Sequence, residues 1–155
     1  MSLSKGYLTS RQKLIWNLKY NGLPESAIAK KLKVNRQTVH KTLCTANVKV
    51  YISLKEVAIL NKIKIEIMDP ARGLLVGYDP HFKTKVIITF SEKNGIQIWH
   101  KHKGDCKNCD QLHFCKKTLL TEAKDRNITL SKNDNLLLPS ELAETLFLKI
   151  LGEKE

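Results

Sequence analysis

Residues 27–43, with the sequence AIAKKLKVNRQTVHKTL, constrain the fold of this chain more than any other stretch. The apolar residues recur at a spacing typical of two short helices that bury a common side. These apolar residues are Ile28, Ala29, Leu32, Val34, Val39 and Leu43. Asn35 is a preferred N-cap residue, so a second helix should begin directly after it, with Lys33 and Val34 in the turn. The stretch therefore predicts a helix-turn-helix.

The polar residues at the start of the second helix are predicted to lie on its outer surface. Side chains of these types can donate hydrogen bonds to base edges and phosphates in the major groove of DNA. The residues expected to contact the groove are Asn35, Arg36, Gln37, Thr38, His40 and Lys41. Arg36 and Gln37 are the best candidates for reading bases. Contacts with phosphates are expected from Lys30, Lys31 and Lys33.

The distribution of charge supports a nucleic-acid partner. The net charge is +12, and residues 1–64 carry 13 Lys and Arg against 2 Asp and Glu, whereas residues 65–155 carry 14 against 13. Dense positive charge favours binding to phosphates through release of counterions. The alternative is a solvated, lysine-rich surface, but that would normally carry matching acids. Residues 1–64 lack those acids, so double-stranded DNA is the favoured partner.

Two segments, LTSRQ and NGLPESAIAKKLKVNRQTV, resemble the helix-turn-helix of archaeal Tfx-type regulators and, more distantly, that of LuxR-type regulators. The shared residues are Leu8, Thr9, Arg11, Gln12, Gly22, Ile28, Ala29, Leu32, Asn35, Thr38 and Val39. The resemblance covers roughly residues 8–45 and implies a transcriptional regulator. One departure is Lys33, where such motifs usually have glycine. Lys33 is therefore expected to adopt a positive φ, at a cost of roughly 1 kcal/mol.

Helices are expected on both sides of this motif. Thr9 and Gln12 form a capping-box pattern ahead of a helix over residues 10–20, and Pro24 suits the first turn of the next helix. The recognition helix is expected to continue to about Asn61, because apolar residues keep a helical spacing; the alternative is a strand around residues 48–52. The continuing apolar residues are Leu43, Ala46, Val50, Leu54, Val57 and Leu60. We expect this stripe to be exposed and to pair with a second chain.

The remaining chain predicts a small α+β domain. Strands are expected over residues 63–68, 73–79, 85–90 and 96–102, the last two joined by a hairpin at Asn94-Gly95. Amphipathic helices are expected over residues 110–126 and from Pro139-Ser140 onward. The predicted fold is thus α+β, with a mainly antiparallel four-stranded sheet and two C-terminal helices. The predicted domains are a helix-turn-helix (1–46), a linker or dimerisation helix (47–62) and an α+β domain (63–152).

Three cysteines within ten residues form a candidate metal site. Cys106 and Cys109 have the C-x2-C spacing that presents two thiolates to one ion, and Cys115 could be a third ligand. The fourth could be a cysteine of another chain, or one of the three nearby histidines His113, His100 and His102. Zinc is the first choice and an iron–sulfur cluster the second. A disulfide and plain thiols are alternatives. Cys44 follows the apolar Leu43 and is expected to pack inside.

No sequence motif indicates an enzyme. There is no paired-carboxylate signature, no serine nucleophile elbow and no phosphate-binding glycine motif. The chain also lacks a long apolar run and a signal-peptide pattern, so we expect a cytoplasmic protein with no membrane partner. The favoured interpretation is a homodimeric, sequence-specific DNA-binding transcriptional regulator, with cysteines that respond to metal or redox state. The alternatives are an architectural DNA-binding protein and a metal- or redox-responsive interaction module.

Overall fold

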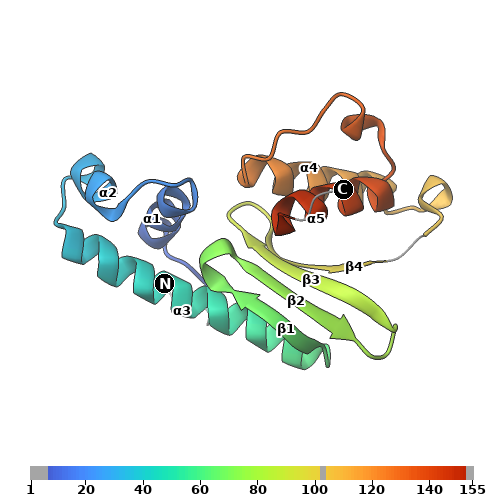
Figure 1. The fold of residues 1–155 in the computed structure, drawn as a ribbon, viewed down its shortest axis with the longest axis horizontal. Coiled ribbons are helices and arrows are strands. Elements are labelled where there is room, and N and C mark those ends of the chain that lie inside the picture. Colours follow the sequence, from blue (N-terminus) through green and yellow to red (C-terminus); the bar gives the residue numbers. More distant parts are fainter. Residues whose placement is uncertain (1–6, 102–103, 153–155) are drawn as a thin grey trace. The chain divides into compact units, whose positions relative to one another are not determined.

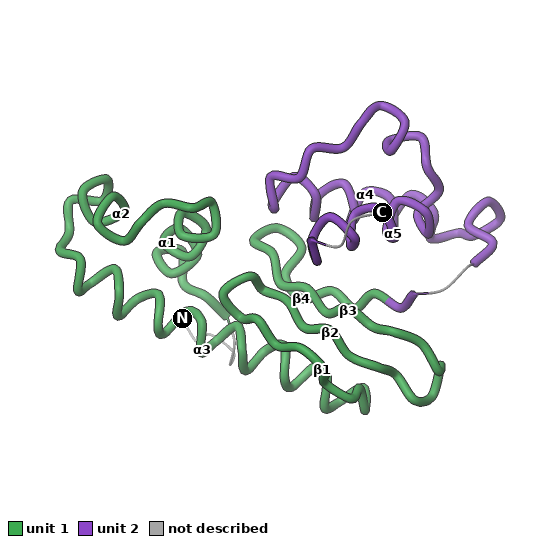
Figure 2. Tube along the Cα trace, in the orientation of Figure 1, with its two compact units in different colours: residues 1–99 green, residues 100–155 purple. Residues whose placement is uncertain are grey.

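The computed structural model describes residues 7–101 and 104–152. The chain divides into two compact units, residues 1–99 and residues 100–155 (Figure 2). The predicted α+β class is confirmed, since the described residues form five α-helices and one four-stranded antiparallel sheet (Figure 1). The predicted order of helices and strands is also confirmed.

Unit 1 begins with three helices, α1 (Ser10–Tyr20), α2 (Glu25–Leu32) and α3 (Arg36–Leu60). The capping box ahead of α1 is confirmed: the Thr9 side chain accepts from the Gln12 backbone, and the Gln12 side chain accepts from the Thr9 backbone. Helix α3 continues without interruption for 25 residues. The helical interpretation of residues 48–52 is therefore confirmed, and the strand alternative is wrong.

The sheet of unit 1 contains β1 (Lys64–Asp69), β2 (Leu74–Asp79), β3 (Thr84–Ser91) and β4 (Gly95–His100), in that order. A 3₁₀ turn over Pro70–Arg72 joins β1 to β2, and Asp69 caps it by accepting from the Arg72 backbone at 3.2 Å. The predicted hairpin between β3 and β4 is confirmed, with Gly95 at a φ of 66°. The sheet is thus a simple meander, as its turn residues predict.

The apolar stripe of α3 is the main difference from the sequence prediction. Ala46, Val50 and Leu54 have no exposed surface. They pack in one core with Trp16 of α1 and with the face of the sheet that carries Leu75, Val86, Ile88 and Phe90. The expectation that the stripe is exposed for a second chain is wrong for these three residues, because the sheet of the same chain covers them, whereas Leu60 at the end of the stripe is 80% exposed.

The boundary between the two compact units lies after residue 99, whereas the sequence predicts a domain boundary at residue 62. The sequence pattern changes from helical to strand-like at residue 62. The helix before this position and the strands after it nevertheless pack side by side (Figure 1) and share one core. The second core of unit 1 lies within the helix-turn-helix and is made of Ile15, Ile28, Ala29, Val39 and Leu43. Helix α3 contributes to both cores, so residues 1–46 and 47–62 belong to one unit.

Unit 2 contains α4 (Leu112–Asp125) and α5 (Pro139–Leu151), with 3₁₀ turns over Cys106–Asn108 and Asp134–Leu136. A buried ion pair at 2.7 Å joins Glu122 of α4 to Arg126, the C-cap residue that directly follows this helix. Among the helices of the described residues, none has the length and apolar character needed to cross a membrane.

Candidate nucleic-acid interface

The turn between α2 and α3 has the backbone geometry that the sequence predicts. Lys33 adopts the left-handed conformation, with φ 53° and ψ 46°. The Lys33 backbone N–H donates to the Lys30 carbonyl at 3.3 Å, and the Val34 N–H donates to the Ala29 carbonyl at 3.0 Å. This pattern of reverse hydrogen bonds ends α2 and satisfies its last carbonyls. The predicted positive φ at Lys33 is confirmed.

Asn35 caps α3, as predicted. The Asn35 Oδ1 accepts from the Thr38 backbone N–H at 2.7 Å and from the Thr38 hydroxyl at 2.8 Å. These hydrogen bonds satisfy a free donor of the first helical turn. Asn35 and Thr38 thus form the cap that begins α3, and their contact with DNA stays a prediction.

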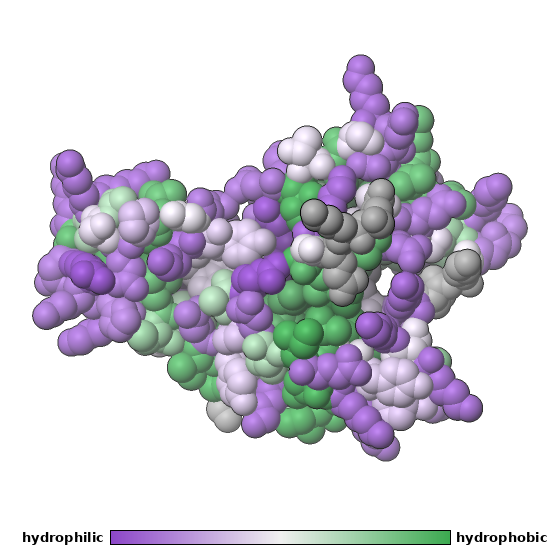
Figure 3. Space-filling view, viewed as in Figure 1, coloured by the Kyte–Doolittle hydropathy of each residue, from purple (hydrophilic) through white to green (hydrophobic). Residues whose placement is uncertain are grey.

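The other predicted DNA contacts are mostly exposed cations and amides. Gln37 and Lys41 are exposed on α3, and the Arg36 side chain is 75% exposed. The lysines predicted to contact phosphates, Lys30, Lys31 and Lys33, are all exposed at the end of α2 and in the turn. Figure 3 shows hydrophilic side chains projecting from this end of unit 1. The helix-turn-helix thus carries a cationic surface over a well-packed apolar core.

Glu25, in the first turn of α2, is a residue that the sequence analysis missed. Its carboxylate lies 3.2 Å from Nδ1 of His40 and 3.7 Å from Nε of Arg36. These contacts join α2 to the first turns of α3. The only sequence signal for this role is that Glu25 and Glu56 are the two acids of residues 1–64.

His40 lies on the exposed face of α3, as predicted, but its ring also has partners within the protein. One ring nitrogen, Nδ1, faces Glu25, and the other, Nε2, lies 3.6 Å from the Cys44 sulfur. Both nitrogens thus have partners within the protein. The prediction rested on the helical position alone, and that position does not show that an acid on α2 is within reach. The expectation that Cys44 packs inside is also wrong, because its side chain is exposed.

The contact between Glu25 and His40 leads to a prediction about acid stability. The hydrogen bond from His40 is the main cause that lowers the pKa of Glu25 below its ordinary value of 4.5, and the charges of His40, Arg36 and Lys19 add to it. A lowered pKa in the folded state means that ionised Glu25 stabilises unit 1 above pH 4.5 and that this contribution is lost as the pH falls through the lowered pKa.

We therefore expect Glu25→Gln to destabilise unit 1 at neutral pH and to have a smaller effect in strong acid. Urea unfolding of both proteins across the acid range measures the difference. In a His40→Gln background, the effect of Glu25→Gln should shrink, because the main partner is missing. An effect of Glu25→Gln that is the same at every pH contradicts the prediction.

The three cysteines of the candidate metal site lie in unit 2. Cys106 begins the 3₁₀ turn, Cys109 follows it and Cys115 is on α4. Burial is the main cause that raises the pKa of the Cys115 thiol, with smaller contributions from the nearby Cys109 and Cys106. All are free thiols, and the Cys106 sulfur lies 3.5 Å from the Ser140 hydroxyl of α5. No disulfide joins the described cysteines, and the disulfide alternative stays a prediction.

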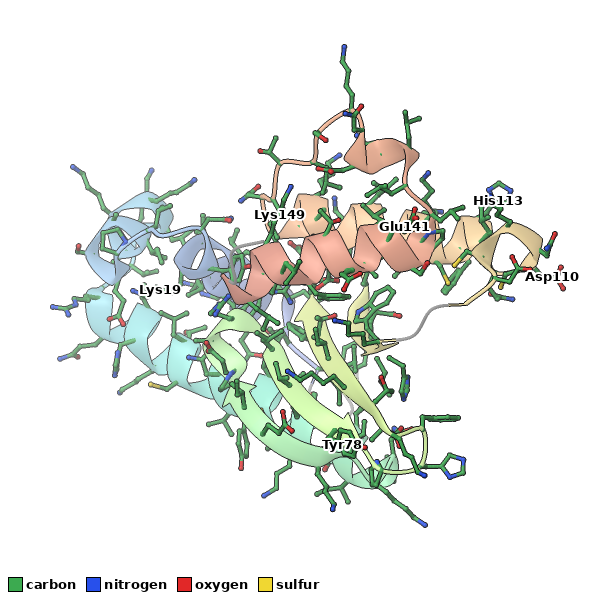
Figure 4. All side chains as sticks on the ribbon, turned by 45° about the vertical axis from the view of Figure 1, so that its right-hand side comes forward. Lys19, Tyr78, Asp110, His113, Glu141 and Lys149 are labelled. Atoms are coloured by element: carbon green, nitrogen blue, oxygen red, sulfur yellow. The ribbon has the colours of Figure 1, made fainter. Side chains whose placement is uncertain are left out.

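The described residues do not gather into a metal site. No group of three or more His, Cys, Asp or Glu among residues 7–101 and 104–152 has an arrangement that could hold an ion. His113 and Cys115 are two positions apart on α4, so they point to nearly opposite sides of the helix. Figure 4 shows His113 projecting outward from α4. His102, another candidate ligand, lies outside the described residues. Zinc or an iron–sulfur cluster stays a prediction.

Comparisons with known proteins add no assignment. No protein-family model, curated protein or solved structure matches this chain.

Proposed function

We propose that unit 1 binds double-stranded DNA through the α2–α3 helix-turn-helix and that the protein is a sequence-specific transcriptional regulator. In this proposal the first turns of α3 enter the major groove. Arg36 and Gln37 contact base edges, and Lys41 adds a cation on the same helix. Lys30, Lys31 and Lys33 contact phosphates. A regulator of this kind acts where the chromosome is, which for an archaeal-type protein is the cytoplasm.

The observation that carries the proposal is the combination of a hydrogen-bonded turn with an exposed cationic surface. Five exposed basic residues lie between the last turns of α2 and the second turn of α3: Lys30, Lys31, Lys33, Arg36 and Lys41. Glu25 is the one acid in this part of the chain, and it holds Arg36 and His40 from the α2 side. A surface of this charge attracts phosphates, while the capped start of the recognition helix can place side chains against base edges.

A homodimer is part of the proposal because one helix-turn-helix reads only a few base pairs. Most of the apolar stripe of α3 is buried within the chain, with Ala46, Val50 and Leu54 fully covered. The dimer therefore needs another surface, and paired half-sites in the bound DNA are its expected signature. Zinc or redox control through Cys106, Cys109 and Cys115 remains a secondary proposal, with elemental analysis of the purified protein as its test.

The DNA proposal is tested by selecting bound sequences from a random duplex pool with the full-length protein. We expect a preferred site. Replacing Arg36 and Gln37 by Ala should then weaken binding to that site by about 30-fold or more, since each good base contact contributes about 1–3 kcal/mol. Binding to random DNA should fall far less. Lys124→Ala, an exposed lysine on α4, is the matched control for loss of one charge.

A triple variant in which Lys30, Lys31 and Lys33 become Ala separates phosphate contacts from base contacts. It should weaken binding evenly across sequences and lower the slope of the salt dependence by about one for each lysine replaced. Binding without any preferred sequence would favour the architectural alternative. Failure of the protein to bind any duplex at low salt would rule out the proposal.

A further inference from the structure

Three titratable side chains of unit 1 form a relay that the DNA-binding proposal does not use. The Glu25 carboxylate lies 3.2 Å from Nδ1 of His40, and Nε2 of His40 lies 3.6 Å from the Cys44 sulfur. Glu25 is on α2, whereas His40 and Cys44 are one turn apart on α3. A carboxylate, an imidazole and a thiol in this order are the groups that make a cysteine nucleophilic.

The geometry determines the direction of proton transfer. An ionised carboxylate can only accept a hydrogen bond, so Nδ1 of His40 carries the proton in its bond with Glu25. In the neutral ring, Nε2 is then the acceptor and faces the Cys44 thiol. His40 can therefore take the thiol proton, and the charge of Glu25 stabilises the imidazolium that results. The pKa of Glu25 lies below its ordinary value, so the carboxylate is ionised at neutral pH.

A small open pocket lies beside the thiol and gives it access to solvent. It has a volume of about 150 Å³ and is lined by Trp16, Lys19, Glu25, His40, Leu43, Cys44, Asn47 and Ala71. The Trp16 indole N–H donates to the Asn47 side-chain oxygen at 3.2 Å, which holds one wall of the pocket. Lys19 contributes a cation from α1, and Lys41 lies one turn before Cys44. The two lysines outnumber the one carboxylate of the lining, Glu25, so the local charge favours an anionic reactant.

We propose that Cys44 is a nucleophilic thiol that forms a mixed disulfide with an anionic low-molecular-weight disulfide, and that this modification weakens DNA binding. The thiol proton moves to Nε2 of His40, and the Cys44 thiolate attacks one sulfur of the disulfide. A new S–S bond forms as the original one breaks. The departing thiolate takes the proton from His40, so Cys44 is oxidised while one half of the reactant is reduced.

The effect on DNA binding rests on the proposed function. Arg36, His40 and Cys44 are four residues apart along α3, so they lie on one stripe of the helix. A mixed disulfide at Cys44 would add a bulky, anionic group beside the proposed DNA-contacting residues. It would also remove the contact between Cys44 and His40. Both changes oppose the approach of a phosphate backbone.

The reactivity of Cys44 is tested on the full-length protein with glutathione disulfide as the anionic probe. Mass spectrometry of digested samples gives the rate of modification at each cysteine. At mildly acidic pH an ordinary thiol is almost fully protonated, so we expect Cys44 to react at least about tenfold faster than an exposed thiol without the relay. The matched control is the double variant Cys44→Ser with Thr45→Cys, which moves the thiol to the next exposed position of α3.

Two variants test the relay itself. His40→Gln should lower the rate at Cys44 to that of the control thiol, and Glu25→Gln should lower it by a smaller factor. His40 is 63% exposed, so its replacement should leave the fold intact, and circular dichroism checks this. Cystamine, a cationic disulfide, should react more slowly than the anionic probe. Equal rates in the wild type, the control and both variants would overturn the proposal.

The link to DNA is measured separately on the sequence that the selection identifies. Modification at Cys44 should reduce affinity at least about tenfold, a reductant should restore it, and the Cys44→Ser variant should be insensitive. Bound DNA should in turn slow the modification of Cys44. If Cys44 is reactive but its modification does not change the affinity for DNA, the proposed link between modification and DNA binding is overturned. If the unmodified protein binds no DNA, the proposed function fails, whereas the rate comparison still decides whether the thiol is activated.

Discussion

Replacing Gly73 by Ala should strongly destabilise unit 1, although it adds only one methyl group. Gly73 ends the 3₁₀ turn between β1 and β2 with φ 59° and ψ 47°, a left-handed conformation. A Cβ at this position would lie 2.4 Å from the Phe90 carbonyl oxygen and 3.2 Å from the Trp16 ring. The Gly73 carbonyl also accepts from the Phe90 backbone N–H at 2.8 Å. The close neighbour is therefore backbone held by a hydrogen bond, and no change of rotamer relieves the clash.

We expect this substitution to lower the free energy of unfolding by roughly 3 kcal/mol or more, about 1 from the positive φ and the remainder from displaced backbone. Gly95→Ala is the matched control. Gly95 has a similar φ of 66°, but a Cβ there would meet nothing within 4 Å. Its cost should be only about 1 kcal/mol.

Urea unfolding followed by tryptophan fluorescence measures both variants. The two tryptophans, Trp16 and Trp99, belong to unit 1, so the signal reports on that unit. Equal stabilities of the Gly73→Ala and Gly95→Ala proteins would show that the Phe90 carbonyl moves away at little cost, and would contradict the prediction.

Leu54→Ala should destabilise unit 1 by about 2–5 kcal/mol, because it removes buried methyl groups and leaves a cavity under the sheet. Leu54 is fully buried on α3. Val48, on the exposed side of the same helix, is 57% exposed. Val48→Ala should therefore change stability by no more than about 0.5 kcal/mol. The same fluorescence-detected unfolding compares the two.

The Leu54 variant also distinguishes an internal core from a core shared between chains. If Leu54 were buried mainly by a second chain, the midpoint of unfolding would depend on protein concentration. We expect the loss of stability in Leu54→Ala to be the same over a wide range of concentrations. A small effect of Leu54→Ala, or one that grows on dilution, would contradict the packing described for α3.

The local features of the fold could be predicted from the sequence because each depends on a few neighbouring residues. Asn35 as a cap, the positive φ at Lys33 and the hairpin at Gly95 are all confirmed. Turn and cap chemistry is set by backbone geometry within about four residues. The periodicity of α3 is likewise sufficient to predict one long helix in place of a strand.

The packing partners of these elements could not be predicted in the same way. A helical apolar stripe must be covered, but periodicity does not say whether a sheet or a second chain covers it. The sequence prediction places Ala46, Val50 and Leu54 against a second chain, whereas the sheet of the same chain covers them.

The contacts within the candidate site could not be predicted from the sequence for the same reason. Glu25 and His40 are 15 residues apart, and their contact depends on how α2 packs against α3. His40 could be placed on the outside of its helix from its position, but not beside a carboxylate. Likewise, the C-x2-C spacing of Cys106 and Cys109 does not determine whether a third ligand lies within reach, and the described residues do not supply one.

Helix α3 makes the helix-turn-helix and the sheet mechanically inseparable. At 25 residues it is a rod of about 37 Å, with one half in the core of the helix-turn-helix and the other beneath the sheet. A twist or shift of the sheet end must be transmitted along the rod to Arg36 and Gln37, because no proline or glycine within α3 provides a joint. A fragment that ends at residue 46 would lack the second half of α3, so its recognition residues would lose the support that this half gains from the sheet. The orientation of the recognition helix is in this sense a property of the whole of unit 1.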